Sequence, residues 1–200
     1  MKKILNILII YIFVIGSSFS LADNTQINIQ NIYKLLKEKK FEESIINLQI
    51  LSEKNDINAQ LLYSKILFSG NITPQDFENS YFWGFSALLG GLKKSSNILK
   101  KLNDYLTDEQ IEEITKNLKI FLEKRAFEND KRAMIQLAKL YEKYINPPDK
   151  INAYTWYNIA VAQGIKTAKL KRDEILNDLS EKDLLEAQTL SIKLFKKINN

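Results

Sequence analysis

The stretch Tyr154-Thr-Trp-Tyr-Asn-Ile-Ala-Val-Ala-Gln-Gly164 decides the fold of this chain. Within it, Trp156, Ile159, Ala160 and Gln163 recur at intervals of three and four residues, which is the period of one face of an α-helix. Gly164 follows the apolar pattern, where a helix commonly ends in a left-handed residue that glycine adopts at little cost. The stretch therefore predicts a helix that buries one face and ends at Gly164.

The same pattern occurs once more, 73 positions earlier. That offset places Tyr81, Trp83, Ala87, Gly91, Leu106, Thr107 and Ile111 on Tyr154, Trp156, Ala160, Gly164, Leu179, Ser180 and Leu184. Further upstream, an offset of 74 matches Ala59 with Ala133, Lys65 with Lys139 and Ile66 with Leu140. The one-residue difference falls in proline-containing loops, where an insertion costs little. An internal repeat of this length indicates a solenoid.

Each copy is expected to be helical throughout. Pro74 and Pro148 stand just before predicted helices, where the missing amide hydrogen does no harm. Thr107 and Gln110 have the spacing of a capping box, and Ser180 with Asp183 forms a looser version. Alternating apolar and polar runs bounded by turns are absent, so no strand is expected. About ten helices of roughly 10–14 residues fit between residue 26 and the C-terminus.

Several residues of the last copy fit a known helical-repeat pattern. They are Ala133, Leu137, Ala138, Leu140 and Tyr141 in the first helix, and Ala153, Trp156, Ala160, Val161, Gln163, Gly164 and Ala168 in and after the second. This pattern resembles the Sel1-like repeat, a relative of the tetratricopeptide repeat. The resemblance covers nearly all of residues 26–197 and is strongest in the last copy. It implies an all-α, right-handed α-α superhelix (solenoid) of helix-turn-helix repeats.

The stacking of such repeats assigns the two tryptophans to the core. One helical pair cannot bury its apolar face alone, so neighbouring pairs stack and share a continuous core. Trp83 and Trp156 are expected to fill the space between adjacent pairs. A role for these rings in stacking against carbohydrate is the less favoured alternative.

The N-terminus has the order of a secretory signal peptide. Lys2 and Lys3 precede an apolar run from Ile7 to Ile15, and small residues follow up to Ala22. The apolar run is shorter than the roughly 20 residues that a membrane-spanning helix needs. We therefore expect a signal peptide over residues 1–22, cleavage after Ala22, and a repeat domain over residues 23–200. The mature chain is expected in the periplasm or outside the cell, without stable membrane insertion; an uncleaved anchor is the alternative.

Composition excludes most kinds of catalytic site. The chain contains no histidine and no cysteine, which rules out Ser-His and Cys-His pairs, imidazole metal ligands and disulfides. Paired carboxylates such as a glycosidase uses are the remaining option. Glu43-Ser44 resembles the catalytic dipeptide of lytic transglycosylases, but none of that family's surrounding motif accompanies it. We expect no enzyme activity, no cofactor and no metal, and a carboxylate-dependent enzyme acting on peptidoglycan is the remote alternative.

Charge patterning argues against nucleic acid as the partner. Removal of Lys2 and Lys3 with the signal peptide lowers the formal net charge from +5 to +3. The remaining lysines are interleaved with acidic residues, as in Lys119, Glu123 and Lys124, and form no dense basic stripe.

The surviving class is binding, which the resemblance assigns to a concave groove lined by the first helix of each pair. Groove-facing candidates carried over from the family are Asn58, Lys65, Arg132, Gln136, Lys139 and Lys143. Their lysines favour an acidic protein or peptide partner. The expected function is that of an exported helical-repeat adaptor in the cell envelope. A structural or self-assembling envelope scaffold is the alternative, since the oligomeric state does not follow from the sequence.

Overall fold

The computed structural model of the chain describes residues 27–200, and it is helical throughout. Within this range there are ten α-helices and one short 3-10 helix, and no strand. The helices are α1 (Ile29–Lys37), α2 (Phe41–Glu53), α3 (Ile57–Ser69), α4 (Phe77–Leu89), η1 (Lys93–Ser95), α5 (Ser96–Leu102), α6 (Asp108–Phe127), α7 (Lys131–Lys143), α8 (Lys150–Ala162), α9 (Ala168–Leu176) and α10 (Glu181–Asn199). The all-α prediction is confirmed, while the predicted signal peptide lies outside the described residues.

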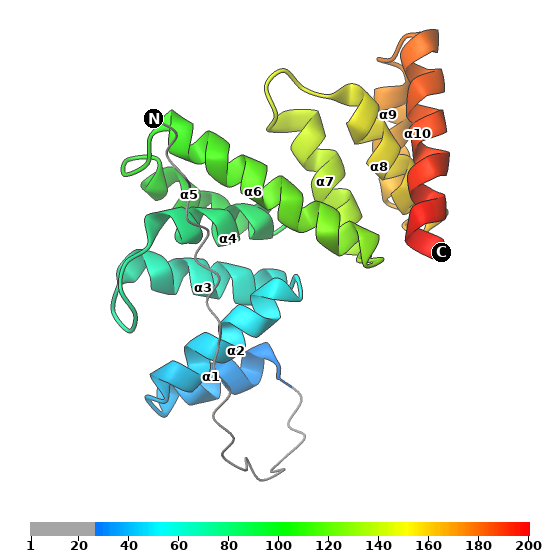
Figure 1. Cartoon of the computed structure of the whole chain (residues 1–200). Coiled ribbons are helices and arrows are strands. Elements are labelled where there is room, and N and C mark those ends of the chain that lie inside the picture. The colour runs from blue at the N-terminus through cyan, green and yellow to red at the C-terminus, as the bar shows by residue number, and fades with distance from the viewer. Residues whose placement is uncertain (1–26) are drawn as a thin grey trace, which may run out of the picture.

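The internal repeat is visible in the bounds of the helices. Both ends of α7 lie 74 positions after those of α3, and both ends of α8 lie 73 positions after those of α4. The helices α5 and α6 correspond to α9 and α10 at offsets between 72 and 74, with small differences in length. We call α3–α6 the first copy and α7–α10 the second copy. Figure 1 shows that consecutive helices stack side by side along a curved array, as expected of a solenoid.

Matching residues also turn the chain between helices. Asn55 and Asn129 both have φ of 63°, which is the left-handed region, and each precedes an aspartate that caps the next helix. The side chains of Asp56 and Asp130 accept hydrogen bonds from the first free amides of α3 and α7. Asparagine tolerates the left-handed conformation better than most residues, so the same corner is built twice.

The last helix of each copy is longer than predicted. The helices α6 and α10 have 20 and 19 residues, because neither contains a glycine or proline that would end it. Thr107 and Gln110 form the complete predicted capping box at the start of α6. At the start of α10, the Ser180 hydroxyl accepts from the amide of Asp183 and donates to its carboxylate, which is the looser arrangement expected.

The apolar core is divided into a large and a small cluster. The large cluster extends through both copies and contains Trp156, which is 2% exposed. Trp83 is also buried, at 8% exposed, but belongs to neither cluster, so the assignment to the core is confirmed for Trp156. The small cluster joins α1, α2 and one face of α3 through Ile32, Leu48, Leu51, Ala59 and Ile66. No helix within the described range is long and apolar enough to cross a membrane.

Candidate functional site

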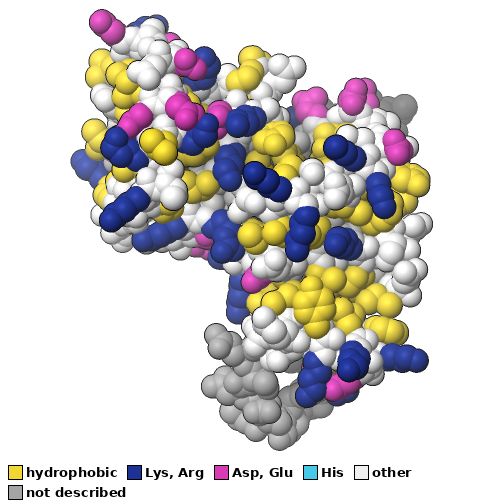
Figure 2. All heavy atoms as spheres, turned by 180° about the vertical axis from the view of Figure 1, so that it is seen from behind, with side chains coloured by type: hydrophobic (Ala, Val, Ile, Leu, Met, Phe, Trp, Pro, Cys, Tyr) yellow, Lys and Arg dark blue, Asp and Glu magenta, His cyan; other side chains and the backbone are white. Residues whose placement is uncertain are grey.

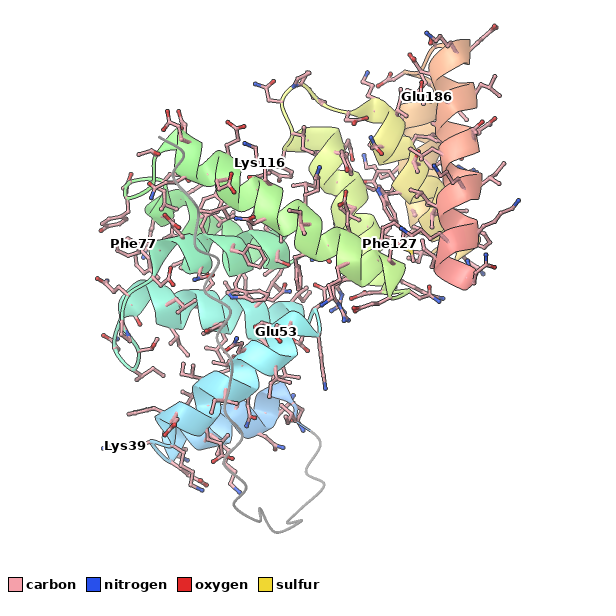
Figure 3. The ribbon with its side chains drawn as sticks, in the orientation of Figure 1. Lys39, Glu53, Phe77, Lys116, Phe127 and Glu186 are labelled. Carbon is pink, nitrogen blue, oxygen red and sulfur yellow. The ribbon has the colours of Figure 1, made fainter. Side chains whose placement is uncertain are left out.

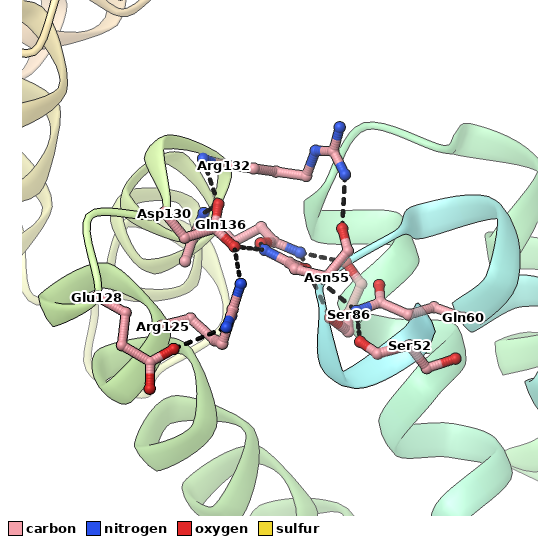
Figure 4. Close-up of polar contacts among 10 residues, drawn as sticks. Ser52, Asn55, Gln60, Ser86, Arg125, Glu128, Asp130, Arg132 and Gln136 are labelled. Atoms are coloured by element: carbon pink, nitrogen blue, oxygen red, sulfur yellow. Dashed lines mark hydrogen bonds and ion pairs between the residues drawn. The ribbon is translucent and has the colours of Figure 1, made fainter. Parts of the chain in front are cut away.

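A buried polar junction connects the corner before α3 with the corner before α7 (Figure 4). Asn55 Nδ2 donates to Gln136 Oε1 at 2.7 Å and to Asp130 Oδ2 at 3.1 Å. Gln60 Nε2 donates to Asn55 Oδ1 at 3.1 Å, and Gln136 Nε2 donates to the backbone oxygen of Ser86 at 2.8 Å. These buried amides bond to one another, with Gln60 Oε1 left without a partner, so the junction fixes how the two corners meet.

The prediction that Gln136 contacts a partner is wrong. Its side chain is fully buried, because both ends of the amide are used inside the junction. Arg132 remains at the surface, and its guanidinium donates to the backbone oxygen of Asn55. Asn58 and Lys65 are exposed on α3. Gln136 and Arg132 therefore hold the two corners together, and the remaining candidates lie on other surfaces.

Two of the predicted residues line one hollow with two further lysines. We call this the lysine hollow: it has a volume of about 460 Å³ and lies where α4, η1, α7, α8 and α9 meet. Its cations are Lys93, Lys139, Lys143 and Lys171. Leu88, Leu89, Ile135 and Tyr144 contribute apolar surface. On the face turned away from Figure 1, lysine and arginine gather over the middle of the molecule (Figure 2).

The electrostatics of the lysine hollow favour an anion. Glu142 is the acidic residue among its lining residues, and its carboxylate accepts from the Tyr157 hydroxyl at 2.8 Å and lies 3.5 Å from Lys143 Nζ. Lys139 Nζ donates to the backbone oxygen of Leu89 at 2.8 Å. Burial lowers the pKa of Lys139, and the neighbouring charge of Lys143 lowers it further. An anion bound here would offset this repulsion.

A second hollow lies between α2, α4 and α6. We call it the aromatic hollow: its volume is about 750 Å³, and its apolar lining is Ile50, Phe82, Trp83, Ile114 and Phe121. The rings of Phe82, Trp83 and Phe121 contact one another edge to face, with centroid separations between 4.8 and 5.7 Å. Its polar rim is Glu53, Lys54, Glu78, Asn79, Asn117, Lys124, Arg125 and Glu128.

The aromatic hollow departs from the predicted groove. The prediction placed the groove on the first helices of the pairs, α3 and α7, whereas α2, α4 and α6 are second helices. None of the six predicted residues lines this hollow. The sequence does not predict that the residues of this hollow come together, because α2 and α6 are far apart along the chain.

The fold of the chain is similar to that of a solved structure. The solved structure is that of c5321, a protective antigen present in uropathogenic Escherichia coli strains and displaying an SLR (Sel1-like repeat) fold. The chain is similar to a Sel1-like repeat protein. Sequence identity is 15% and the TM-score is 0.39, over 78% of this chain and 41% of the antigen, so this chain spans less than half of the antigen's length. No protein-family model matches the chain. No curated protein sequence matches it either.

No metal centre is found between residues 27 and 200. In that range there is no group of three or more histidine, cysteine, aspartate or glutamate side chains placed to hold an ion. The carboxylates weighed as catalytic candidates lie at the surface: Glu43 is exposed near the start of α2, and Glu112 forms an ion pair with Lys116. The two hollows therefore define the candidate functional surfaces.

Proposed function

We propose that the chain is an exported helical-repeat adaptor that binds an acidic segment of a protein partner in the lysine hollow. The observation that carries this proposal is the convergence of four lysines from three parts of the fold on one concave, partly apolar surface. Complementary charge steers such a partner to the surface, and the apolar lining adds burial once it is bound.

The contacts of Glu142 within the protein favour a partner segment that carries only acidic side chains over one that carries both charges. Its carboxylate is already bonded to the Tyr157 hydroxyl and close to Lys143. Lys93 is exposed and forms no ion pair within the described residues. Lys143 and Lys171 have intramolecular partners in Glu142 and Glu174, so a carboxylate brought in by a partner would meet Lys93 as the unpaired cation of the hollow within residues 27–200.

Export is the part of the proposal that depends on the N-terminal sequence. A basic start, a short apolar run and small residues before Asp23 support cleavage after Ala22 and residence in the periplasm or outside the cell. N-terminal sequencing of the protein recovered from its producing cells tests this. A mature chain that starts at Asp23 is the expected result, and an intact Met1 on a membrane-bound chain would contradict it.

Charge reversal tests the binding site. A fluorescent peptide of alternating glutamate and leucine serves as the probe, and anisotropy measures its affinity at several salt concentrations. We expect Lys93→Glu with Lys143→Glu to weaken binding at least tenfold, and we expect wild-type affinity to fall steeply with salt because exposed charges are screened. The matched control is Lys182→Glu with Lys193→Glu on α10, which changes the net charge equally and should have little effect. Equal losses in the two double variants would show that only the net charge attracts the peptide.

A self-assembling scaffold is the second candidate function. Leu185 and Ile192 are 67% and 59% exposed, and their spacing of seven residues places them on one face of α10. Exposed apolar residues grouped on one face are typical of a protein contact. Light scattering separates the candidates, because an adaptor is expected to be monomeric and a scaffold to grow with concentration.

A further inference from the structure

The second copy shows what fills the space that is hollow in the first. The ring of Phe127, at the end of α6, lies edge to face against Trp156, with centroids 6.0 Å apart at 72°. Lys197 Nζ lies 4.2 Å from the centre of the same Phe127 ring. A phenylalanine supplied by the preceding helix α6 thus lies between the tryptophan and an ammonium group of the second copy, where ring contact and cation–π attraction both stabilise it.

The first copy keeps the tryptophan and the lysine but lacks the phenylalanine. Trp83 and Lys124 correspond to Trp156 and Lys197 at the offset of 73, and both line the aromatic hollow. At the position of Phe127, 74 residues earlier, the helix before the first copy has Glu53, which also lines the hollow. Figure 3 shows Glu53 at the end of α2 and Phe127 at the end of α6. Trp83 and Lys124 are therefore present without a counterpart of Phe127, and the ring contacts of Trp83 are with Tyr63, Phe82 and Phe121 instead.

Two further differences keep the first copy open. In the second copy Thr155 Oγ1 donates to the backbone oxygen of Ala187, which brings α8 and α10 into close contact. The corresponding residues of the first copy are Phe82 and Ile114, whose bulk does not allow α4 and α6 to approach in this way. The hollow is thus built into the first copy by larger residues at the contact of its second helices.

The rim of the aromatic hollow is polar, whereas the corresponding positions of the second copy are apolar. Asn117 and Arg125 line the hollow, and the second copy has Leu190 and Ile198 at these positions. An aromatic floor with a polar rim resembles a binding surface more than an unfilled core. The volume of about 750 Å³ lies in the range of roughly 300–1,000 Å³ typical of ligand pockets.

We propose that the aromatic hollow binds an aromatic side chain of a partner protein segment. The incoming ring takes the place over Trp83 that Phe127 has over Trp156, and Lys124 lies across it as Lys197 lies across Phe127. This site shares helix α4 with the lysine hollow but none of its lining residues, so the inference goes beyond the proposed function.

The chain offers a direct readout, because it contains only two tryptophans. N-acetyl-phenylalanine amide is titrated into the full repeat domain, and the two indole N–H signals are followed by NMR after assignment with Trp83→Phe and Trp156→Phe. We expect the Trp83 signal to shift and the Trp156 signal to remain in place. N-acetyl-leucine amide, which has no ring, should shift the Trp83 signal less at equal concentration.

Filling the hollow from within tests the assignment more sharply. Glu53→Phe installs the residue of the closed copy and should abolish the Trp83 shift, whereas the control Glu53→Gln, which removes only the charge, should retain it. Lys124→Ala should weaken binding about two- to fivefold, the size of an exposed cation–π contact. If Glu53→Phe does not fold, Asn117→Leu, which also imports a residue of the closed copy, tests the same expectation.

Three results would overturn the inference. They are no shift of the Trp83 signal at any concentration, equal shifts of both tryptophans, and a Trp83 shift that persists when the hollow is filled. The lysine-hollow double variant, Lys93→Glu with Lys143→Glu, should leave the Trp83 shift unchanged. Its result therefore separates failure of this inference from failure of the proposed function.

Discussion

The first two helices of each copy, α3 with α4 and α7 with α8, have matching lengths, but the interiors of the two copies differ. In the second copy α8 and α10 are in close contact, with a hydrogen bond from Thr155 to the backbone of Ala187. In the first copy Phe82 and Ile114 stand at these positions, and a hollow of about 750 Å³ lies beside them. A solenoid can therefore create a concave surface by enlarging a few residues at the contact between two of its helices.

The corner residues differ in the same way. Asn55 and Asn129 have the same left-handed conformation, yet Asn55 is buried in the polar junction and Asn129 is exposed. Gln136, which completes the junction, corresponds to Leu62 in the first copy. Both corners therefore have the same backbone conformation, whereas the hydrogen-bond partners of each asparagine depend on which helices lie next to the corner.

The largest expected loss of stability comes from removing the Trp156 ring from the second copy. Trp156→Ala removes a fully packed ring against Phe127 and should lower the free energy of unfolding by about 3–5 kcal/mol. Guanidinium unfolding followed by circular dichroism measures this loss. An unchanged unfolding midpoint would contradict the assignment of Trp156 to the core.

Importing a bulky residue into the closed copy should have the next largest effect. Thr155→Phe places the residue of the open copy at a fully buried position, and overpacking of this kind costs about 1–3 kcal/mol. Urea unfolding compares it with Thr189→Phe. Thr189 is exposed on α10, the helix that Thr155 of α8 contacts, so this substitution should change the free energy of unfolding little. Equal stability of the two variants would mean that residue size at this contact does not separate the copies.

The polar junction should be sensitive to one amide. Gln136→Leu introduces the first copy's residue and leaves one buried N–H of Asn55 without its acceptor, at a cost of about 1–3 kcal/mol, while the Ser86 backbone oxygen keeps its bond from the Gly90 amide. Gln49→Leu, at an exposed glutamine of α2, should stay within about 0.5 kcal/mol of wild type. A neutral Gln136→Leu would show that the two corners meet without these bonds.

The smallest expected effect is a loss of stability at high pH. Tyr141 and Tyr157 are buried, and their hydroxyls donate to Glu123 and Glu142. Burial and the nearby carboxylates raise the pKa of both phenols, whereas the first copy has Leu67 and Gly84 at these positions. A raised folded-state pKa gives stability that is complete below the unfolded value of about 10 and is lost as pH rises above it.

The measurement is urea unfolding between pH 9 and pH 11 in steps of about half a unit. Each phenol should remove up to about 1.4 kcal/mol of stability per pH unit above about pH 10. Tyr157→Phe should make the decline shallower than in wild type. A decline of the same slope in both proteins would show that Tyr157 ionises equally in the folded and unfolded states.

The sequence predicted the repeat, the helical fold and the main signals at helix ends, because these depend on spacing that is local or periodic. Trp156, Gly164 and the capping box at Thr107 all behave as their patterns indicate. Gln136 was misplaced because its partners Asn55 and Ser86 are 81 and 50 residues away, and no local pattern reports such contacts. The aromatic hollow was missed for the same reason, although the differences between the copies at Phe82 and Glu53 were visible in the alignment.

The division of the core into two clusters has a consequence for the order in which the chain opens. The cluster of α1, α2 and one face of α3 contains five buried apolar residues, so these helices are expected to open locally before the rest. Helix α2 is also one wall of the aromatic hollow. A partner held there would need α2 in place, and amide hydrogen exchange in α2 should slow when the hollow is occupied. Binding of a partner in the aromatic hollow would then stabilise the N-terminal helices, which are the least stable end of the array.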